Sequence, residues 1–263
     1  MQIAGTNVLL TGASGGIGQA VARELAARGA HMSLSGRRGD LLEELAIELG
    51  GRAIEADLAD AAQVVHLAQA GGEVDILVAN AALPAAGKLE SFTPEEVDRA
   101  LDVNLRAPIA LAHALLPGML ARGRGHLLFM SSIAGKTTVP GNPLYHASKF
   151  GLRGFASALR QDLHGSGVGV SCVFPGFIRD AGIFADSGAR LPPGTGTRSP
   201  EDVARGVVEA IEQDRGEVDV AALPQRAGAL IAGFAPDLAA AVVRRAGGLR
   251  IAEEMERSLR AKR

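Results

Sequence analysis

The feature that most constrains the fold is the regular alternation of short apolar runs with longer segments of helical periodicity. The short runs have the length of strands, are bounded by Gly, Asn, Ser or Pro, and are almost continuously apolar. Strands of this kind are typical of a parallel sheet covered on both faces. We predict five such strands and two weaker ones: Val8–Thr11, Met32–Ser35, Asp75–Ala79, His126–Met130 and Val168–Phe174, and then Arg52–Ala56 and Val218–Ala222.

Segments with apolar residues at every third or fourth position separate these strands and are predicted helices. They are Ile17–Arg28, Asp40–Leu49, Ala61–Ala70, Pro94–Met119 and Leu144–Leu163. The alternation predicts an α/β fold: a single doubly wound (Rossmann) domain with a parallel sheet of about seven strands flanked by helices. We place this domain at residues 1–224, with a C-terminal helical extension, residues 225–263, packed on it.

Composition removes several classes of protein. The 263 residues are 47% hydrophobic, so the chain can bury a substantial core, and a formal charge of −2 gives no basis for binding nucleic acid. The single cysteine, Cys172, and six scattered histidines predict neither a disulfide nor a metal site. The N-terminus lacks a signal-peptide pattern, and no run reaches about 18 apolar residues. We therefore expect a cytoplasmic protein without an integral membrane segment.

A glycine-rich turn, Thr11-Gly12-Ala13-Ser14-Gly15-Gly16-Ile17-Gly18, joins the first predicted strand to the first predicted helix. Glycines let a diphosphate approach the backbone, and the helix N-terminus offers unpaired N–H groups to that anion. An ordinary strand–helix turn can also be rich in glycine. The position between a strand and a helix nevertheless favours a dinucleotide site.

Arg37 and Arg38 follow the second predicted strand. Enzymes that select NAD place a carboxylate near this point to bind the ribose 2′-hydroxyl, whereas guanidinium groups pair with a 2′-phosphate. The sequence therefore favours NADP(H), unless both arginines are simply solvated. Asp57, after the third strand, can accept from the adenine amino group or serve as a turn residue or N-cap.

Tyr145 and Lys149 lie four residues apart at the start of a predicted helix, so their side chains share one face. Because an ammonium favours the phenolate, we expect a tyrosine pKa well below 10, suited to general acid–base catalysis. Ser132 follows the fifth strand, 13 residues before Tyr145. Asn104 lies within a long helical segment, where a buried amide needs a partner. Taken singly, each residue also fits an ordinary structural role.

Together and in this order, these motifs resemble the classical short-chain dehydrogenase/reductase family over residues 7–220. The resemblance rests on the glycine turn, Asp57-Leu58, Val78-Ala79-Asn80-Ala81-Ala82, Asn104, Ser131-Ser132, Tyr145-x-x-x-Lys149 and Pro175-Gly176. It implies that Tyr145 exchanges a proton with the substrate oxygen, which Ser132 polarises. Lys149 would lower the tyrosine pKa and bind the nicotinamide ribose, and Asn104 would hold a water linking Lys149 to solvent.

The resemblance also implies a cofactor site and an assembly. Residues of the cofactor site would be Gly12, Ser14, Gly16, Ile17, Gly18, Arg37, Arg38, Asp57, Leu58, Asn80, Ala81, Tyr145, Lys149, Pro175, Gly176 and Ile178. Relatives are commonly oligomers, so we expect a homodimer or homotetramer. Two positions depart from the family pattern: Ala82 replaces a usual glycine, and Asp180 replaces a threonine that usually bonds the nicotinamide carboxamide.

The segment 180–200 is dense in Gly, Pro and Ser, and we expect it to form a substrate lid. Apolar residues here and beside the site predict a hydrophobic substrate, unless they only pack the lid: Ile183, Phe184, Leu191, Leu83, Ile133, Pro140 and Leu144. The extension carries eight basic residues, Lys262 and Arg263 among them, and four acidic ones. Its helices would line the substrate pocket or form an oligomer interface. Alternatively, they would present a basic amphipathic surface to a membrane or an acyl carrier.

These observations predict an NADP(H)-dependent oxidoreductase that interconverts a ketone or aldehyde with an alcohol, on a hydrophobic small-molecule substrate. Three alternatives remain: a catalytically idle nucleotide-binding regulatory protein on the same fold, a 3-oxoacyl reductase of fatty-acid synthesis, and a different reaction on this scaffold such as epimerisation or dehydration. The length of the chain and the order of its motifs argue against the last of these. The complete set of Asn104, Ser132, Tyr145 and Lys149 argues against the idle protein. The extra tail and the apolar lid argue against the 3-oxoacyl reductase.

Overall fold

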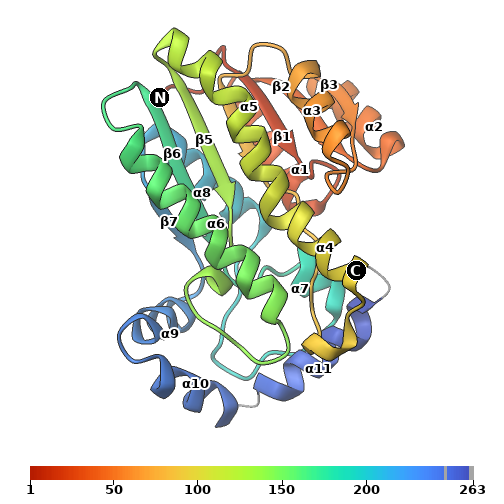
Figure 1. Ribbon diagram of the computed structural model, residues 1–263, viewed down its shortest axis with the longest axis vertical. Coiled ribbons are helices and arrows are strands. Elements are labelled where there is room, and N and C mark those ends of the chain that lie inside the picture. The colour runs from red at the N-terminus through yellow and green to blue at the C-terminus, as the bar shows by residue number, and fades with distance from the viewer. Residues whose placement is uncertain (246–247, 261–263) are drawn as a thin grey trace.

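The computed structural model describes residues 1–245 and 248–260 (Figure 1). These residues form one parallel sheet with the strand order β3-β2-β1-β4-β5-β6-β7. The strands are β1 (Asn7–Thr11), β2 (His31–Gly36), β3 (Arg52–Glu55), β4 (Ile76–Ala79), β5 (Gly125–Met130), β6 (Val168–Pro175) and β7 (Glu217–Val220). The predicted doubly wound α/β fold and its seven strands are confirmed.

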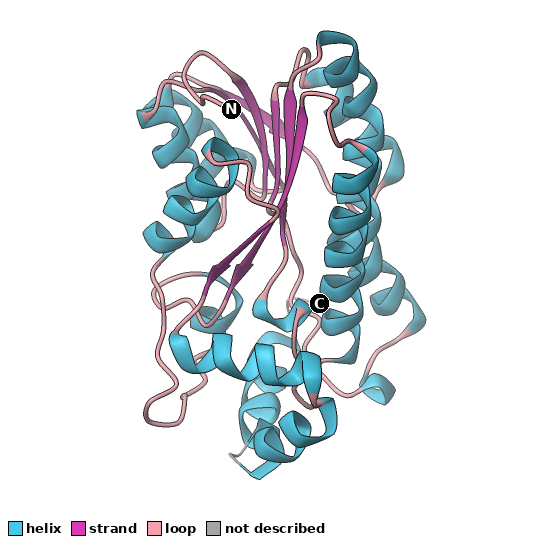
Figure 2. Ribbon diagram, turned by 90° about the vertical axis from the view of Figure 1, so that its left-hand side faces the viewer, coloured by secondary structure: helices cyan, strands magenta, loops and turns pink. Residues whose placement is uncertain are grey.

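Helices cover both faces of the sheet (Figure 2). The layer on one face is α1 (Gly16–Ala27), α2 (Gly39–Leu49) and α8 (Pro200–Glu212), and the layer on the other is α3 (Ala61–Ala70), α5 (Ala107–Arg122) and α6 (Pro143–Asp162). Side chains of a strand alternate between these layers. Val8 and Leu10 belong to the core beneath α1 and α8, whereas Leu9 belongs to the core beneath α3 and α5.

The strand order reverses at β1, which pairs with β2 on one side and with β4 on the other. In open α/β sheets, connections diverge at such a switch point and leave a crevice at the carboxyl ends of the strands. The chain segments at the ends of β1, β4, β5 and β6 converge on this edge. They carry the glycine turn, Asn80, Ser132 and Pro175-Gly176.

The helix predicted at Pro94–Met119 has three parts. α4 (Pro94–Leu101) leads into a π-helical turn, η2 (Asp102–Arg106), which leads into α5. By length and composition alone this continuous stretch is apolar enough to cross a membrane. Its buried side chains, such as Leu111 and Met119, pack in the core beneath the sheet, as in a core helix of a globular domain.

The stretch expected as a substrate lid is helical at its start. α7 (Gly182–Ser187) ends at Gly188, whose φ of 63° terminates the helix. Phe184 in α7 packs against Phe177 with a ring-centroid distance of 4.8 Å. That packing stabilises a short helix where local composition alone indicates a loop.

The C-terminal extension contributes three further helices within the described residues. They are α9 (Leu223–Phe234), α10 (Pro236–Arg245) and α11 (Gly248–Leu259). In the view of Figure 1 all three lie below the carboxyl edge of the sheet. Lys262 and Arg263, which add to the basic charge expected for the extension, lie outside the described residues.

Candidate active site

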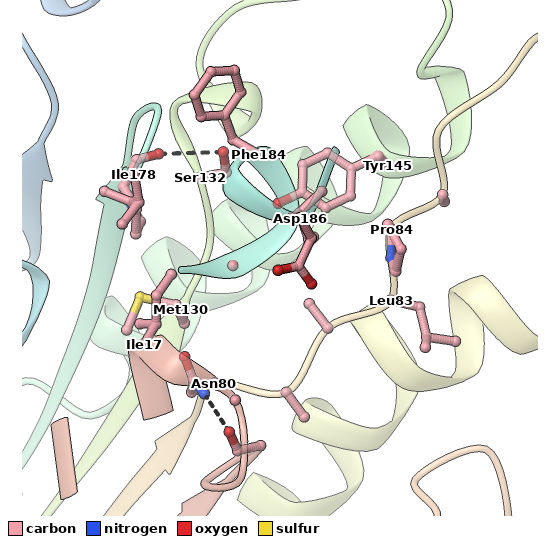
Figure 3. Close-up of a pocket in the computed structure, with 18 of the residues that line it drawn as sticks. Ile17, Asn80, Leu83, Pro84, Met130, Ser132, Tyr145, Ile178, Phe184 and Asp186 are labelled. Atoms are coloured by element: carbon pink, nitrogen blue, oxygen red, sulfur yellow. Dashed lines mark hydrogen bonds between the residues drawn. The ribbon is translucent and has the colours of Figure 1, made fainter. Parts of the chain in front are cut away.

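A cleft of about 760 Å³ occupies the carboxyl edge of the sheet. Tyr145, Ser132, Phe184 and Asp186 lie toward one end of it and Asn80 toward the other (Figure 3). Every predicted catalytic and cofactor-binding residue lines this cleft except Asn104. Residues spread over most of the chain are therefore brought into one site.

The glycine turn closely approaches the end of β4. Gly12 has a φ of 68°, and a Cβ atom there would lie 2.8 Å from the Cα of Ala81. A Cβ on Gly18 would lie only 2.2 Å from the carbonyl oxygen of Gly12. The Asn80 amide donates to the carbonyl oxygens of Thr11 at 3.1 Å and Gly12 at 3.3 Å. Glycine is thus required for the turn, and Asn80 fixes its shape as a cradle for an anion at the N-terminus of α1.

The end of β2 brings positive charge to the cleft. Arg37 and Arg38 both line it, and the Arg38 guanidinium hydrogen-bonds the Ser14 backbone carbonyl. Asp57 pairs with Arg99 at 2.9 Å and accepts from the Ala59 N–H. Burial raises the pKa of Asp57, but these partners outweigh burial and hold the pKa below its usual value. The N-cap of α3 is not Asp57 but Asp60, whose carboxylate accepts from two backbone N–H groups.

Tyr145 and Lys149, both on α6, form the other end of the cleft with Ser132. The Lys149 ammonium lies 5.6 Å from the centre of the Tyr145 ring and donates to the Met130 carbonyl at 2.9 Å. The Ser132 hydroxyl accepts from the Ala134 N–H at 3.1 Å and donates to the Pro175 carbonyl at 3.3 Å, and it lies close enough to the Tyr145 phenol to lower the pKa of that phenol. The i, i+4 spacing on a helix and the end of β5 are what bring these three groups together.

The expected low tyrosine pKa is wrong for this structure. Burial raises the pKa of Tyr145 to about 12, because the hydrogen bond from Ser132 offsets only part of the desolvation. Burial also lowers the pKa of Lys149 to about 8. Both groups are therefore biased toward their neutral forms, and the phenol keeps its proton.

Asn104 is buried in η2, away from the cleft wall. Its amide oxygen accepts from the Leu83 N–H at 2.7 Å, and its amide nitrogen donates to the Leu83 carbonyl at 3.0 Å. Leu83 itself lines the cleft. Asn104 thus anchors the segment after β4, and its part in a water-mediated proton relay remains a prediction.

Asp180 does not line the cleft. It adopts a left-handed conformation with a φ of 68°, and its carboxylate points to solvent and pairs with Arg179 at 3.3 Å. The next residue, Ala181, lies against Gly16, where a Cβ would approach the Ala181 Cβ to 2.5 Å. The expectation that Asp180 takes the place of the carboxamide-binding threonine is therefore wrong.

Sequence reasoning missed several residues of the cleft. His146 is buried, pairs with the Ala134 carbonyl at 2.8 Å and accepts from the Val139 N–H at 3.0 Å, so it holds the loop after β5. Met255 and Leu259 of α11 close the cleft from the C-terminal extension, and their i, i+4 spacing was a usable signal. Of the predicted apolar substrate residues, some line the cleft and others do not: Leu83, Ile133, Ile183 and Phe184 do, whereas Pro140, Leu144 and Leu191 do not.

Comparison with known proteins agrees with this geometry. The family model described as short chain dehydrogenase matches residues 6–190. Ketoacyl reductase HetN of Nostoc sp. is 35% identical over 227 residues, which are 83% of this chain and 79% of HetN. A short-chain dehydrogenase from Sphingobium yanoikuyae in complex with NADPH has a TM-score of 0.74 at 27% identity, covering 81% of this chain and 86% of that one. One from Burkholderia phymatum in complex with NAD has a TM-score of 0.79 at 23% identity, covering 91% and 97%, and shows the fold alone.

A doubly wound sheet with a glycine turn and a Ser–Tyr–Lys cluster in one cleft defines a dinucleotide-dependent oxidoreductase. The chain belongs to the short-chain dehydrogenase/reductase family. It is an NAD(P)-dependent oxidoreductase, and the alternative of an idle nucleotide-binding protein is not supported.

Proposed function

We propose that the protein interconverts a ketone or aldehyde with the corresponding alcohol, with NADP(H) as its preferred dinucleotide. The observation that carries the proposal is the presence of Ser132, Tyr145 and Lys149 in the same cleft as the glycine turn and Arg37. The bound dinucleotide supplies or accepts the hydride. The chain supplies the proton, the orientation and the exclusion of water.

Tyr145 is the proposed proton donor in reduction and acceptor in oxidation. Its partly buried phenol keeps the proton that a carbonyl oxygen needs as it becomes an alcohol. Ser132 lies beside the phenol and would hold the substrate oxygen there. Lys149, with its pKa lowered to about 8, would return a proton to Tyr145 near neutral pH.

The residues of the cleft fit a dinucleotide. The close approaches at Gly12 and Gly18 show that the turn is tightly folded, and its glycines line the cleft in front of the N-terminus of α1, where a diphosphate would reach the backbone. Arg37 and Arg38 stand where an acidic residue would favour NAD, so their charge supports selection of a 2′-phosphate. Asn80 and Ala81 would contact the adenosine ribose, and Pro175, Gly176 and Ile178 the nicotinamide end.

A hydrophobic substrate fits the part of the cleft next to Tyr145. Apolar side chains from four separate segments line it: Leu83, Pro84, Ile133, Val139, Ile183, Phe184, Met255 and Leu259. The nearby charged groups are Asp186 and Lys149. Burial of apolar substrate surface against these side chains would contribute roughly 25 cal/mol per Å².

The proton-transfer role is tested by Tyr145→Phe, assayed with a panel of carbonyls and alcohols and both NADPH and NADH. Loss of the phenolic proton should lower turnover about a thousand-fold, while NADPH affinity by calorimetry stays close to wild type. Turnover at the wild-type rate in Tyr145→Phe would refute the role. The cofactor preference is tested by Arg37→Asp, which should lower kcat/KM with NADPH about ten-fold or more and leave NADH almost unchanged.

A 3-oxoacyl reductase is a second candidate, because the relative HetN bears the name ketoacyl reductase. Acetoacetyl thioesters separate the two proposals. A kcat/KM for these thioesters well above that for bulky apolar ketones would favour the reductase. A kcat/KM for bulky apolar ketones well above that for the thioesters would favour a hydrophobic ketone as the substrate.

We also propose an organisation for the whole protein. Residues 1–224 would form the dinucleotide-binding and catalytic unit, with residues 180–200 as its substrate lid, and residues 225–263 would pack on the same unit. Contacts between α11 and α7 support this arrangement. A cytoplasmic homodimer or homotetramer is the assembly we propose, and equilibrium sedimentation tests it.

A further inference from the structure

The pair of helices α9 and α10 exposes an unusual concentration of large apolar side chains. Phe234 is 85% exposed and Leu230 is 66% exposed. The exposed apolar side chains of this pair are Leu223, Leu230, Ile231, Phe234, Leu238 and Val242. Single exposed apolar residues are ordinary, but a group of them within two adjacent helices marks an interaction surface.

These side chains form continuous stripes rather than scattered positions. Leu223, Leu230 and Phe234 follow the i, i+7, i+11 spacing of one helical face, and Leu238 and Val242 are four residues apart on α10. The buried residues of the two helices are alanines, one in each: Ala229 and Ala239. The helices thus pack through small residues and turn their large apolar faces outward.

The charge around these stripes is positive. Arg226, Arg244 and Arg245 are exposed and form no ion pair with any residue that the structure describes, whereas Asp237 is the one acidic residue between positions 223 and 245. Arg245 lies seven residues after Leu238, on the same face of α10 as that side chain. Apolar side chains flanked by arginines are complementary to an anionic lipid surface, with its acyl boundary and negative headgroups.

We propose that α9 and α10 dock the protein on the surface of an anionic lipid membrane. The positive charge argues against a second copy of this chain as the occupant. In a two-fold symmetric dimer the same patch lies on both sides of the interface, so Arg245 of one copy would face the same positively charged patch of the other copy. A lipid surface supplies the opposite charge instead.

The docking surface lies next to the wall of the catalytic cleft. Gln225, in the first turn of α9, accepts from the Phe177 N–H at 3.0 Å and donates to the Gly196 carbonyl at 2.8 Å. Phe177 lines the cleft, and Gly196 belongs to the proposed lid. A docked protein would therefore hold its cleft near the acyl boundary, where apolar carbonyl compounds concentrate. The docking itself does not depend on the proposed reaction.

Flotation of the full chain with lipid vesicles tests the proposal. The protein should float with vesicles of phosphatidylcholine mixed with phosphatidylserine, and much less with phosphatidylcholine alone. Leu230→Ser/Phe234→Ser should lower the floated fraction about ten-fold, because it removes apolar contact area. Its matched control, Ile47→Ser/Val65→Ser, changes two apolar side chains that are 81% and 56% exposed elsewhere and should float like wild type.

Charge is tested separately by Arg244→Glu/Arg245→Glu, which should lower flotation with the mixed vesicles and abolish its dependence on salt. Failure of the wild-type protein to float with anionic vesicles overturns the proposal, as does equal loss in the Ile47/Val65 control. If the wild-type protein does not bind vesicles, and Leu230→Ser/Phe234→Ser has a lower mass in sedimentation than wild type, the surface is a contact between copies of the chain. All these variants should keep wild-type activity on a water-soluble carbonyl. A loss of flotation with unchanged activity is then a loss of membrane docking and not a failure of the proposed reaction.

Discussion

At the scale of single residues, burial decides the protonation state of the proposed catalytic pair. Tyr145 and Lys149 lie in the same low-dielectric region, which penalises phenolate and ammonium alike. The Lys149 ammonium also donates to the Met130 carbonyl rather than to the phenol. The site therefore holds a protonated phenol ready for transfer, and charge on Lys149 varies near pH 8.

Tyr145 is the one tyrosine of a chain without tryptophan, so ultraviolet titration of the apoprotein reports it alone. We expect ionisation near pH 12 in the folded protein, and near 10 in guanidinium. Ser132→Ala should move the folded value higher, because the serine hydrogen bond lowers it. Ionisation of the wild-type apoprotein below 10 would contradict this and restore the expectation based on Lys149.

His126 should make the free energy of unfolding depend on pH. Its imidazole is buried in β5 against the Ser171 hydroxyl, and burial lowers its pKa to about 4 despite the nearby Asp214. Between pH 6.5 and 4 the unfolded chain binds a proton that the folded protein does not. The free energy of unfolding should therefore fall by about 3 kcal/mol as pH drops through this window.

Urea unfolding at pH 7 and at pH 4 measures the effect. His126→Gln should be destabilised at neutral pH but should lose much less stability on acidification. The exposed His66→Gln is the control and should follow wild type. An identical loss on acidification in His126→Gln and wild type would exclude this histidine as the cause.

At the scale of elements, a π-helical turn positions the wall of the cleft. The turn η2 interrupts the helix between α4 and α5 and places Asn104 where both ends of its amide meet the Leu83 backbone. π-Helical turns within α-helices occur frequently at functional sites. Here the turn connects the helical layer to the segment after β4, and so fixes Leu83 at the wall of the cleft.

Asn104→Ala should destabilise the protein by about 2–5 kcal/mol, because it leaves the buried Leu83 N–H and carbonyl without partners. Activity should fall as well, since Leu83 lines the cleft. Asp102→Ala, in the same turn, removes only a surface pair with Arg106 and should cost less than about 1 kcal/mol. Chemical unfolding and kcat/KM of both variants measure the difference, and equal losses would contradict the anchoring role.

At the scale of the whole molecule, the two ends of the chain meet in the cleft. Ser14 lies near its beginning, and Met255 and Leu259 near its end, yet all three line the same space. α11 also packs on the loop before α6, where a Cβ on Gly141 would come within 2.7 Å of the Ala252 Cβ. Helix α11 of the extension therefore forms part of the wall of the cleft.

Met255→Trp should narrow this space. We expect kcat/KM for bulky ketones to fall about ten-fold or more relative to small ketones, with little change in the KM for NADPH. Glu253→Ala, at an exposed position of the same helix, is the control and should leave the ratio unchanged. A uniform loss on all substrates in Met255→Trp would mean that α11 affects folding rather than specificity.

The fold and much of the candidate site were predictable because their signals are local. The strands are short apolar runs, the glycine turn lies between a strand and a helix, and Tyr145 and Lys149 share a helical face by spacing alone. The orientation of Asp180 was not predictable, since its left-handed φ depends on how the following residue packs against Gly16. The helix α7 was missed for a similar reason: packing of Phe184 on Phe177 overrides a composition typical of loops.

By itself, the sequence determined the strands, most of the helices, their order and the identity of the groups that can do chemistry, whereas α7 and the π-helical turn η2 were not predicted. The predicted features follow from periodicity and spacing within a few residues. Only the tertiary structure decided the depth of burial of Tyr145, the anchoring of Leu83 by Asn104 and the return of α11 to the cleft. Each depends on segments distant in the chain, and the free energy of a buried charge or hydrogen bond is set by which atoms surround it in space.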